Sequence, residues 1–104
     1  MDPSEKIIVK ADSELADLIP VYLKRRESDL AAITAAAEAR DFDRLQTLGH
    51  QMKGSGAGYG FDVISEIGAA LEVEAKEKRT ERVSGLVSRL ADFLKRVEVD
   101  FEPG

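Results

Sequence analysis

The sequence contains no cysteine, no tryptophan and only one histidine in 104 residues. Without cysteine the chain cannot form a disulfide, a zinc–thiolate site or a cysteine nucleophile. It also has only three prolines, so little in it interrupts helices, and helix-forming residue types dominate. Reactive chemistry in this protein therefore centres on the single histidine, His50.

Long apolar runs and an excess of positive charge are missing as well. The N-terminal segment is polar apart from the short run Ile7–Val9, so we expect neither a signal peptide nor a membrane span. A formal net charge of −5 disfavours a general nucleic-acid binder, whose affinity comes from lysine and arginine contacts to phosphates. We expect a cytoplasmic, monomeric protein whose partner is another protein. The initial methionine and the short Glu-Pro-Gly end favour a free-standing chain.

Four segments repeat their apolar residues with the period of amphipathic helices. In a chain of this length they can share one hydrophobic core. We predict helices over about 20–39, from Asp41 or Asp43 to about 56–58, from Phe61 or Asp62 to about 76, and from about 81, after a Thr80 cap, to Val97 or beyond. Asp12 or Ser13 can cap a short extra helix that begins at Glu14 and ends before Pro20.

These elements and their short connections predict an all-α fold, an antiparallel up-down four-helix bundle with a short extra N-terminal helix. The bundle domain is expected over residues 12–100, with an N-terminal arm at 1–11 and a C-terminal tail at 101–104. Ile7–Val9 favours a strand, but with no second strand in evidence we expect it to pack on the bundle as part of the arm. The charged run Lys24–Glu27 is expected to be a solvated face, with the Arg26 methylenes lying along the apolar stripe.

His50 lies in a glycine-rich segment, 45–61, whose first part is helical in our prediction. Leu48 and Met52 fall on the core side of that helix, and His50, about 160° from both, faces solvent. Its neighbours on the outer face are Gln46, Thr47, Lys53 and Gly54. Because glycine is unfavourable inside a helix, we interpret Gly54 as a gap that lets another protein approach the imidazole. The later glycines are expected to form the C-terminal turn of the helix.

Three kinds of site are disfavoured around His50. A carboxylate-bridged di-metal site needs Glu-x-x-His pairs, whereas this chain has one histidine with no glutamate three residues before it. A serine hydrolase could use Ser55, but the segment has no nucleophile elbow, and we identify no buried carboxylate that would orient His50. A nucleotide-binding P-loop is excluded because the sequence lacks G-x-x-x-x-G-K-[ST].

What remains is His50 as a nucleophile toward phosphorus. A free imidazole has a pKa of about 6.5, so much of it is neutral and nucleophilic at neutral pH. Phosphoryl transfer depends mainly on positioning and charge neutralisation by the protein. Lys53, one turn away, can screen the phosphoryl oxygens, and Gln46 and Gln51 can form hydrogen bonds at the rim of the site.

The run His50–Gly56, read as His-x-x-Lys-Gly-Ser-Gly and followed by Gly60-Phe61, resembles the motif of histidine-containing phosphotransfer (HPt) domains. Leu71-Glu72 falls where that family usually has a Leu-Glu pair, and the resemblance extends over residues 12–98. The Lys-Gly-Ser core is intact, while Gly49 replaces the alanine often found before the histidine.

The resemblance implies that His50 is phosphorylated and relays a phosphoryl group between receiver-domain aspartates in two-component signalling. The implied partners are a response-regulator receiver domain, a hybrid histidine kinase, or both. The receiver is expected to supply Mg²⁺, and this chain to need no metal or cofactor and to have no kinase activity. We predict that Lys53 screens the phosphate and that the partner contacts Gln46, Gln51, Gly54 and Ala57. The alternative is a non-catalytic helical adaptor that docks a partner through the glycine-flanked face, with His50 unphosphorylated.

Overall fold

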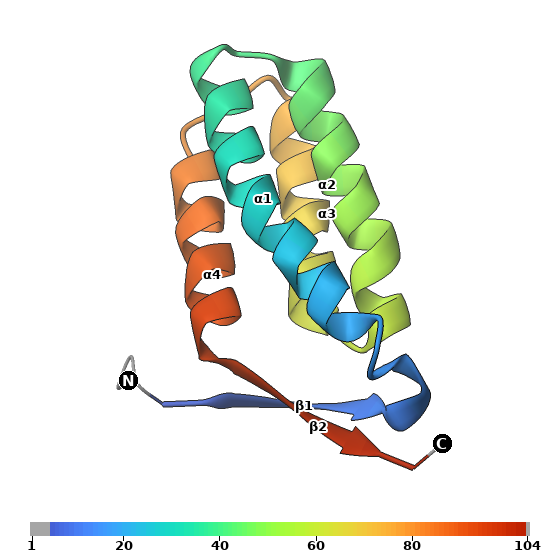
Figure 1. Ribbon diagram of the computed structural model, residues 1–104. Helices are drawn as coiled ribbons and strands as arrows, with labels where there is room; N and C mark the ends of the chain where they lie inside the picture. The colour runs from blue at the N-terminus through green and yellow to red at the C-terminus, as the bar shows by residue number, and fades with distance from the viewer. Residues whose placement is uncertain (1–4, 104) are drawn as a thin grey trace.

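The computed structural model describes residues 5–103, so residues 1–4 of the expected arm and residue 104 of the expected tail lie outside the described chain. The described part contains four α-helices: α1 (Ile19–Glu38), α2 (Phe42–Gly56), α3 (Asp62–Lys76) and α4 (Val83–Arg96). They lie side by side, with the α1–α2 and α3–α4 connections at one end and two strands across the other (Figure 1). The predicted helical bundle is confirmed in this broad form. None of the helices within residues 5–103 combines the length and the apolar character that a membrane crossing requires.

The strands are the main departure from the prediction. β1 (Ile7–Asp12) and β2 (Val97–Glu102) form a parallel pair in which Ile7 lies opposite Val97. Ile7 and Val9 do pack against the core, as expected of the arm. The expectations that Ile7–Val9 has no partner strand and that the last helix reaches Val97 or beyond were wrong. The physical reason is alternation, because Ile7, Val9, Ala11, Val97 and Val99 pack against the bundle while the residues between them face solvent.

The helix boundaries follow local signals with two exceptions. The Asp41 side chain accepts a hydrogen bond of 3.1 Å from the Arg44 backbone N–H and caps α2, as predicted. The expected N-terminal helix is only one 3₁₀ turn, Ser13–Leu15, capped by the Asp12 side chain. Thr80 is not the cap of α4, since that helix begins at Val83 after Arg82 and has no side-chain cap.

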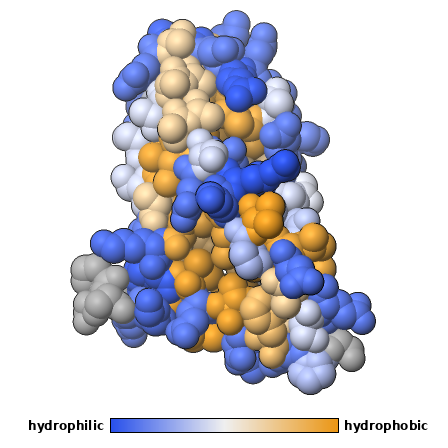
Figure 2. Space-filling model, viewed as in Figure 1, coloured by the Kyte–Doolittle hydropathy of each residue, from blue (hydrophilic) through white to orange (hydrophobic). Residues whose placement is uncertain are grey.

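The α2–α3 interface is the most extensive contact between helices and contains the centre of the core. Its fully buried side chains include Leu45 and Met52 from α2 and Ile64, Ile67 and Leu71 from α3. α2 continues into a second 3₁₀ turn, Ala57–Tyr59, and Gly60 follows with a φ of 91°, so the glycine-rich segment does form the predicted turn. Figure 2 shows that the strongly hydrophobic residues of one face gather toward the strand end of the molecule.

Candidate functional site

His50 projects from the solvent-facing side of α2. Its side chain is 75% exposed, whereas Leu48 and Met52, on the opposite side of the same helix, are 4% and 0% exposed. The placement inferred from helical periodicity is therefore correct. A ring this open to solvent contributes little to packing and is accessible to a reacting group.

Glu72 on α3 is the residue that orients the imidazole. Its Oε2 atom lies 3.1 Å from Nδ1 of His50, and its side chain is only 11% exposed. The expectation that no buried carboxylate would orient His50 was therefore wrong. Sequence analysis noted Glu72 only as part of the Leu-Glu pair, because the partner of His50 comes from a different helix.

Lys53 lies on the other side of the same carboxylate. Its Nζ atom is 3.6 Å from Oε1 of Glu72, and its side chain is 55% exposed. Burial at the interface acts to raise the pKa of Glu72, but the hydrogen bond with His50 and the charges of Lys76 and Lys53 outweigh burial, so the pKa lies below its ordinary value. Glu72 is therefore ionised at neutral pH.

The ionised carboxylate decides which ring nitrogen is free. A carboxylate can only accept hydrogen bonds, so Nδ1 of His50 must carry a hydrogen to donate to Oε2. In the neutral ring this leaves the lone pair on Nε2. The arrangement presents Nε2 as the nucleophilic atom of an exposed histidine.

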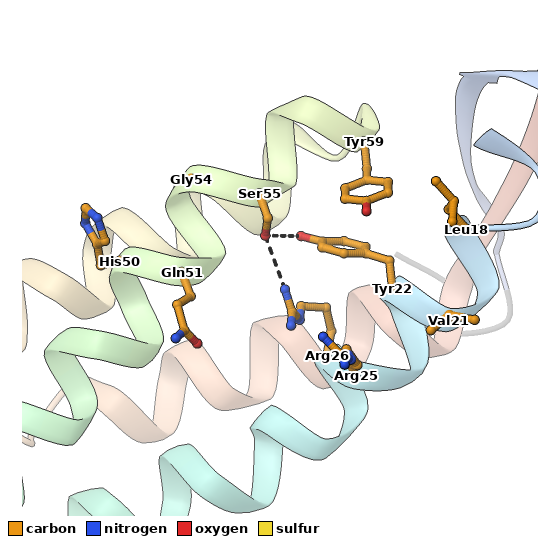
Figure 3. A pocket seen from close by; sticks show the side chains of 10 residues that line it. All are labelled: Leu18, Val21, Tyr22, Arg25, Arg26, His50, Gln51, Gly54, Ser55 and Tyr59. Carbon is orange, nitrogen blue, oxygen red and sulfur yellow. Dashed lines mark hydrogen bonds between the residues drawn. The ribbon is translucent and has the colours of Figure 1, made fainter. Parts of the chain in front are cut away.

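His50 borders two hollows, which share His50 and Gln51. The first, the α1–α2 groove, has a volume of about 650 Å³ and is drawn in Figure 3; it is lined by Leu18, Val21, Tyr22, Arg25, Arg26, His50, Gln51, Gly54, Ser55 and Tyr59. The second, the α2–α3 hollow, is lined by Asp43, Gln46, Thr47, His50, Gln51 and Glu72.

The structure brings most of the predicted site residues around His50. Gly54 lies exposed in the α1–α2 groove, and a Cβ added to it would meet nothing within 4 Å. Gln46 lines the α2–α3 hollow, and Gln51 lines both. Ala57 lies apart from both hollows, where it begins the 3₁₀ turn and donates its backbone N–H to Ser65. Within residues 5–103, no three histidine or acidic side chains form a group that could hold a metal ion.

A polar cluster joins α1 to α2 at the floor of the groove. Ser55 Oγ lies 2.9 Å from the Tyr22 hydroxyl and accepts a hydrogen bond of 3.2 Å from Arg26 (Figure 3). The Arg26 guanidinium also pairs with Asp29 at 2.8 Å and lies over the Tyr22 ring. The low exposure of Arg26, 11%, agrees with its expected place along the apolar stripe. Its contacts with Ser55 and Asp29 were not predicted.

The contacts within this cluster also keep the Ser55 hydroxyl from pairing with His50. Because the Ser55 hydroxyl is engaged by Tyr22 and Arg26, it forms no nucleophile–base pair with the imidazole. Burial raises the pKa of Asp29, and the opposing charges of Arg26, Arg44 and Arg25 do not cancel that effect. The serine hydrolase interpretation therefore remains disfavoured even though His50 has an orienting carboxylate.

The family model described as the Hpt domain matches residues 17–100, a span that includes all four helices and His50, Lys53 and Glu72. No curated protein and no solved structure matches the chain. The matched span covers most of the sequence and contains the exposed histidine described above. The chain therefore belongs to the Hpt domain family and has that family's general role, histidine phosphotransfer in two-component signalling.

Proposed function

We propose that Nε2 of His50 accepts a phosphoryl group from an aspartyl phosphate of a receiver domain and then passes it to a second receiver aspartate. The observation that carries this proposal is the contact between Nδ1 of His50 and Glu72 at 3.1 Å. In the neutral ring this contact leaves the lone pair on Nε2, on a side chain that is 75% exposed. A phosphoacceptor histidine needs this combination of a fixed tautomer and free access.

The transfer step balances without loss of a proton. The Nε2 lone pair forms the N–P bond while the P–O bond to the donor aspartate breaks, and the aspartate leaves as a carboxylate. Nδ1 keeps its hydrogen, so the ring becomes positively charged. The ionised Glu72, already hydrogen-bonded to Nδ1, compensates this charge at a fixed position. Transfer to the second receiver reverses the same bonds.

Lys53 is the cation closest along the helix to the reacting nitrogen. It lies three residues after His50, on the adjacent part of the α2 surface, and its exposed ammonium can turn from Glu72 toward the phosphoryl oxygens. We assign the Mg²⁺ that phosphoryl transfer uses to the receiver, because aspartates supply the oxygen ligands that this ion prefers. In this proposal the chain is a phosphocarrier without kinase activity and without a cofactor of its own.

The direct test is phosphoryl transfer from a receiver domain loaded with acetyl phosphate. The parent chain should take up an acid-labile label, and a His50→Gln variant should take up none while melting at nearly the same temperature. Label on the variant would show that another residue is the acceptor. A receiver that binds the parent chain tightly but transfers no label would favour the helical adaptor instead.

A second test concerns the absence of kinase activity. Incubation of the purified chain with ATP and Mg²⁺ alone should leave it unlabelled, because no segment of the sequence has the pattern of a nucleotide-binding loop. Label that appears from ATP without any kinase or receiver would overturn the carrier assignment.

A further inference from the structure

The two hollows that border His50 differ in charge. The α1–α2 groove is lined by Arg25 and Arg26 and by no carboxylate. The α2–α3 hollow is lined by Asp43 and Glu72 and by no lysine or arginine. Because the charge of Glu72 is offset by Lys53 and His50, the negative charge that a partner meets in the α2–α3 hollow is that of Asp43. A partner that reaches His50 therefore meets a cation on the α1 side of the imidazole and an anion, Asp43, on the other.

Arg25 is the cation of the groove that is available to a partner. Arg26 is already paired with Asp29 and bonded to Ser55, so its charge is offset within the fold. Arg25 is exposed and forms no salt bridge within residues 5–103. Figure 3 shows it on α1, across the groove from the segment of α2 that carries Gly54 and Ser55.

The groove becomes apolar away from His50. Leu18 and Val21 are 52% and 59% exposed at its far end, where Tyr59 stacks on Tyr22 at 4.3 Å between ring centroids. His50 and Tyr59 are nine positions apart, a distance of about 13 Å along a helix. Exposed apolar side chains that gather beside a reactive residue are typical of a docking surface.

A receiver domain has the complementary chemistry. Its phosphoacceptor is an aspartate, and a Mg²⁺ ion beside it requires further oxygen ligands, so the rim of its active site is acidic. Such a rim is attracted by Arg25 and repelled by Asp43, and like charges brought together at an interface are costly. Gly54 leaves open space on the favourable side, beside His50.

We propose that the receiver docks over the α1–α2 groove and not over the α2–α3 hollow, and that Arg25, Leu18 and Val21 determine which receivers are accepted. The surface that fits carries acidic side chains beside the phosphoaspartate and an apolar side chain about 13 Å away. This inference rests on the proposed function, since it takes His50 as the phosphoacceptor.

The test compares charge reversals on the two sides of His50. The donor is the receiver that loads the parent chain fastest in a panel phosphorylated with acetyl phosphate. Arg25→Glu should raise the KM for this donor by about tenfold or more, with a smaller effect at high salt, because rim charges act on encounter. Asp43→Lys, the matched control in the other hollow, should leave the KM unchanged or lower it. The opposite pattern would place the receiver over the α2–α3 hollow and overturn the inference.

The contribution of the apolar end of the groove is tested with a second pair of matched variants. Val21→Gln should raise the KM, whereas Val73→Gln, at a valine on α3 that is 49% exposed, should not. Equal effects of the two substitutions would show that Val21 has no specific contact. Labelling with phosphoramidate, a small donor that needs no docking surface, should be the same for all four variants and the parent.

Phosphoramidate labelling also separates this inference from the proposed function. If phosphoramidate labels His50 but Arg25→Glu and Val21→Gln transfer from the receiver like the parent, the docking surface is wrong and the acceptor assignment stands. If His50 is labelled by neither donor, the proposed function fails and the docking inference fails with it.

Discussion

Gly49 and Gly68 face each other across the α2–α3 interface with no room for a methyl group on either. A Cβ on Gly49 would lie 2.8 Å from the Gly68 carbonyl oxygen and 2.8 Å from the Glu72 backbone nitrogen, and a Cβ on Gly68 would lie 2.6 Å from the Gly49 carbonyl oxygen. The two helix backbones are therefore nearly in contact beside the site. This close approach places the Glu72 carboxylate within hydrogen-bond distance of His50.

Gly49→Ala should destabilise the domain. The added methyl group meets backbone atoms of α3, which cannot move aside alone, and overpacking of this kind costs about 1–3 kcal/mol. Urea denaturation of parent and variant measures the loss. Gly85→Ala is the matched control, because Gly85 lies in α4 with nothing within 4 Å of an added Cβ, and it should stabilise the domain by up to about 1 kcal/mol. A Gly49→Ala variant as stable as the parent would mean that the helices are not this close.

Glu72→Gln should slow phosphoryl acceptance without preventing it. The amide oxygen of glutamine can still accept a hydrogen bond from Nδ1, but it cannot compensate the charge that the ring acquires. We expect a decrease in the transfer rate of about ten- to a hundredfold, less than the loss of a donor in an active site closed to water. Rapid-quench measurements at saturating receiver would show this as a fall in kcat. An unchanged kcat would show that Glu72 only orients the imidazole ring and does not compensate its charge during transfer.

The same variant should change the pH dependence of stability. The pKa of Glu72 in the folded protein is below its ordinary value of 4.5. Its carboxylate therefore stabilises the fold above that pH, and this contribution is lost as the pH falls through the lower folded-state pKa. The stability difference between parent and Glu72→Gln should be present at about pH 6 and shrink below about pH 4.

The pH experiment must compare the parent with Glu72→Gln, because Asp29 changes the stability of the fold with pH in the opposite direction to Glu72. Burial raises its pKa, so its protonation favours the folded state as the pH falls. Asp29 is present in both proteins, and its effect cancels in the difference. A difference that grows toward acid pH would contradict the lowered pKa of Glu72.

Lys53→Ala should slow transfer by about ten- to a thousandfold, or about 1.4–4 kcal/mol of transition-state stabilisation, the range for loss of one electrostatic donor. Binding of the unphosphorylated receiver should weaken much less. Lys95→Ala, at an exposed lysine of α4, controls for the change in net charge. If binding and rate fall equally, Lys53 is a docking contact and does not screen the phosphate.

Gly54→Gln should separate stability from function. Glutamine is the better helix former, and a Cβ at this exposed position meets nothing within 4 Å, so the domain should gain a few tenths to about 1 kcal/mol. The same side chain would project into the space beside His50, where a displacement of about 1 Å can reduce the rate a hundredfold.

Gly85→Gln gives the control for that variant, because Gly85 is helical, exposed and equally open but lies on α4. It should gain similar stability and transfer at the parent rate. A Gly54→Gln variant with normal transfer would show that the partner does not approach across this glycine, and one that melts lower would show that Gly54 has a role in packing.

The sequence predicted the parts of the site that a single helix determines. The outward direction of His50 and the open position of Gly54 follow from helical periodicity around Leu48 and Met52. Glu72 could not be read in that way, since it depends on the register between two helices. The signal that could have found it is symmetry about the turn, because His50 and Glu72 lie the same number of residues before and after Phe61.

The other features that the sequence did not predict, the Ser55–Arg26 contact and the strand pair, also depend on contacts between segments far apart in the chain. The Ser55–Arg26 contact joins residues 29 positions apart, and neither residue alone indicates the other. The strand pattern of Val97–Phe101 is visible in the sequence, but it directly follows an amphipathic helix whose period we extended too far. Its pairing partner, Ile7–Val9, lies near the other end of the chain. A run this short does not predict a strand unless the strand that pairs with it has been identified.

The pairing of Ile7 with Val97 joins the two most distant parts of the described chain, and this gives the molecule two regions of unequal cooperativity. A contact of such long range carries a large loop-closure entropy, whereas α2 and α3 are joined by a turn of a few residues and meet by local contacts, which form early in folding. The strand pair should therefore open and close on its own while the helical hairpin stays formed. Amide hydrogens of β1 and β2 should exchange faster than those of α2 and α3, and His50 should keep its contact with Glu72 throughout these openings.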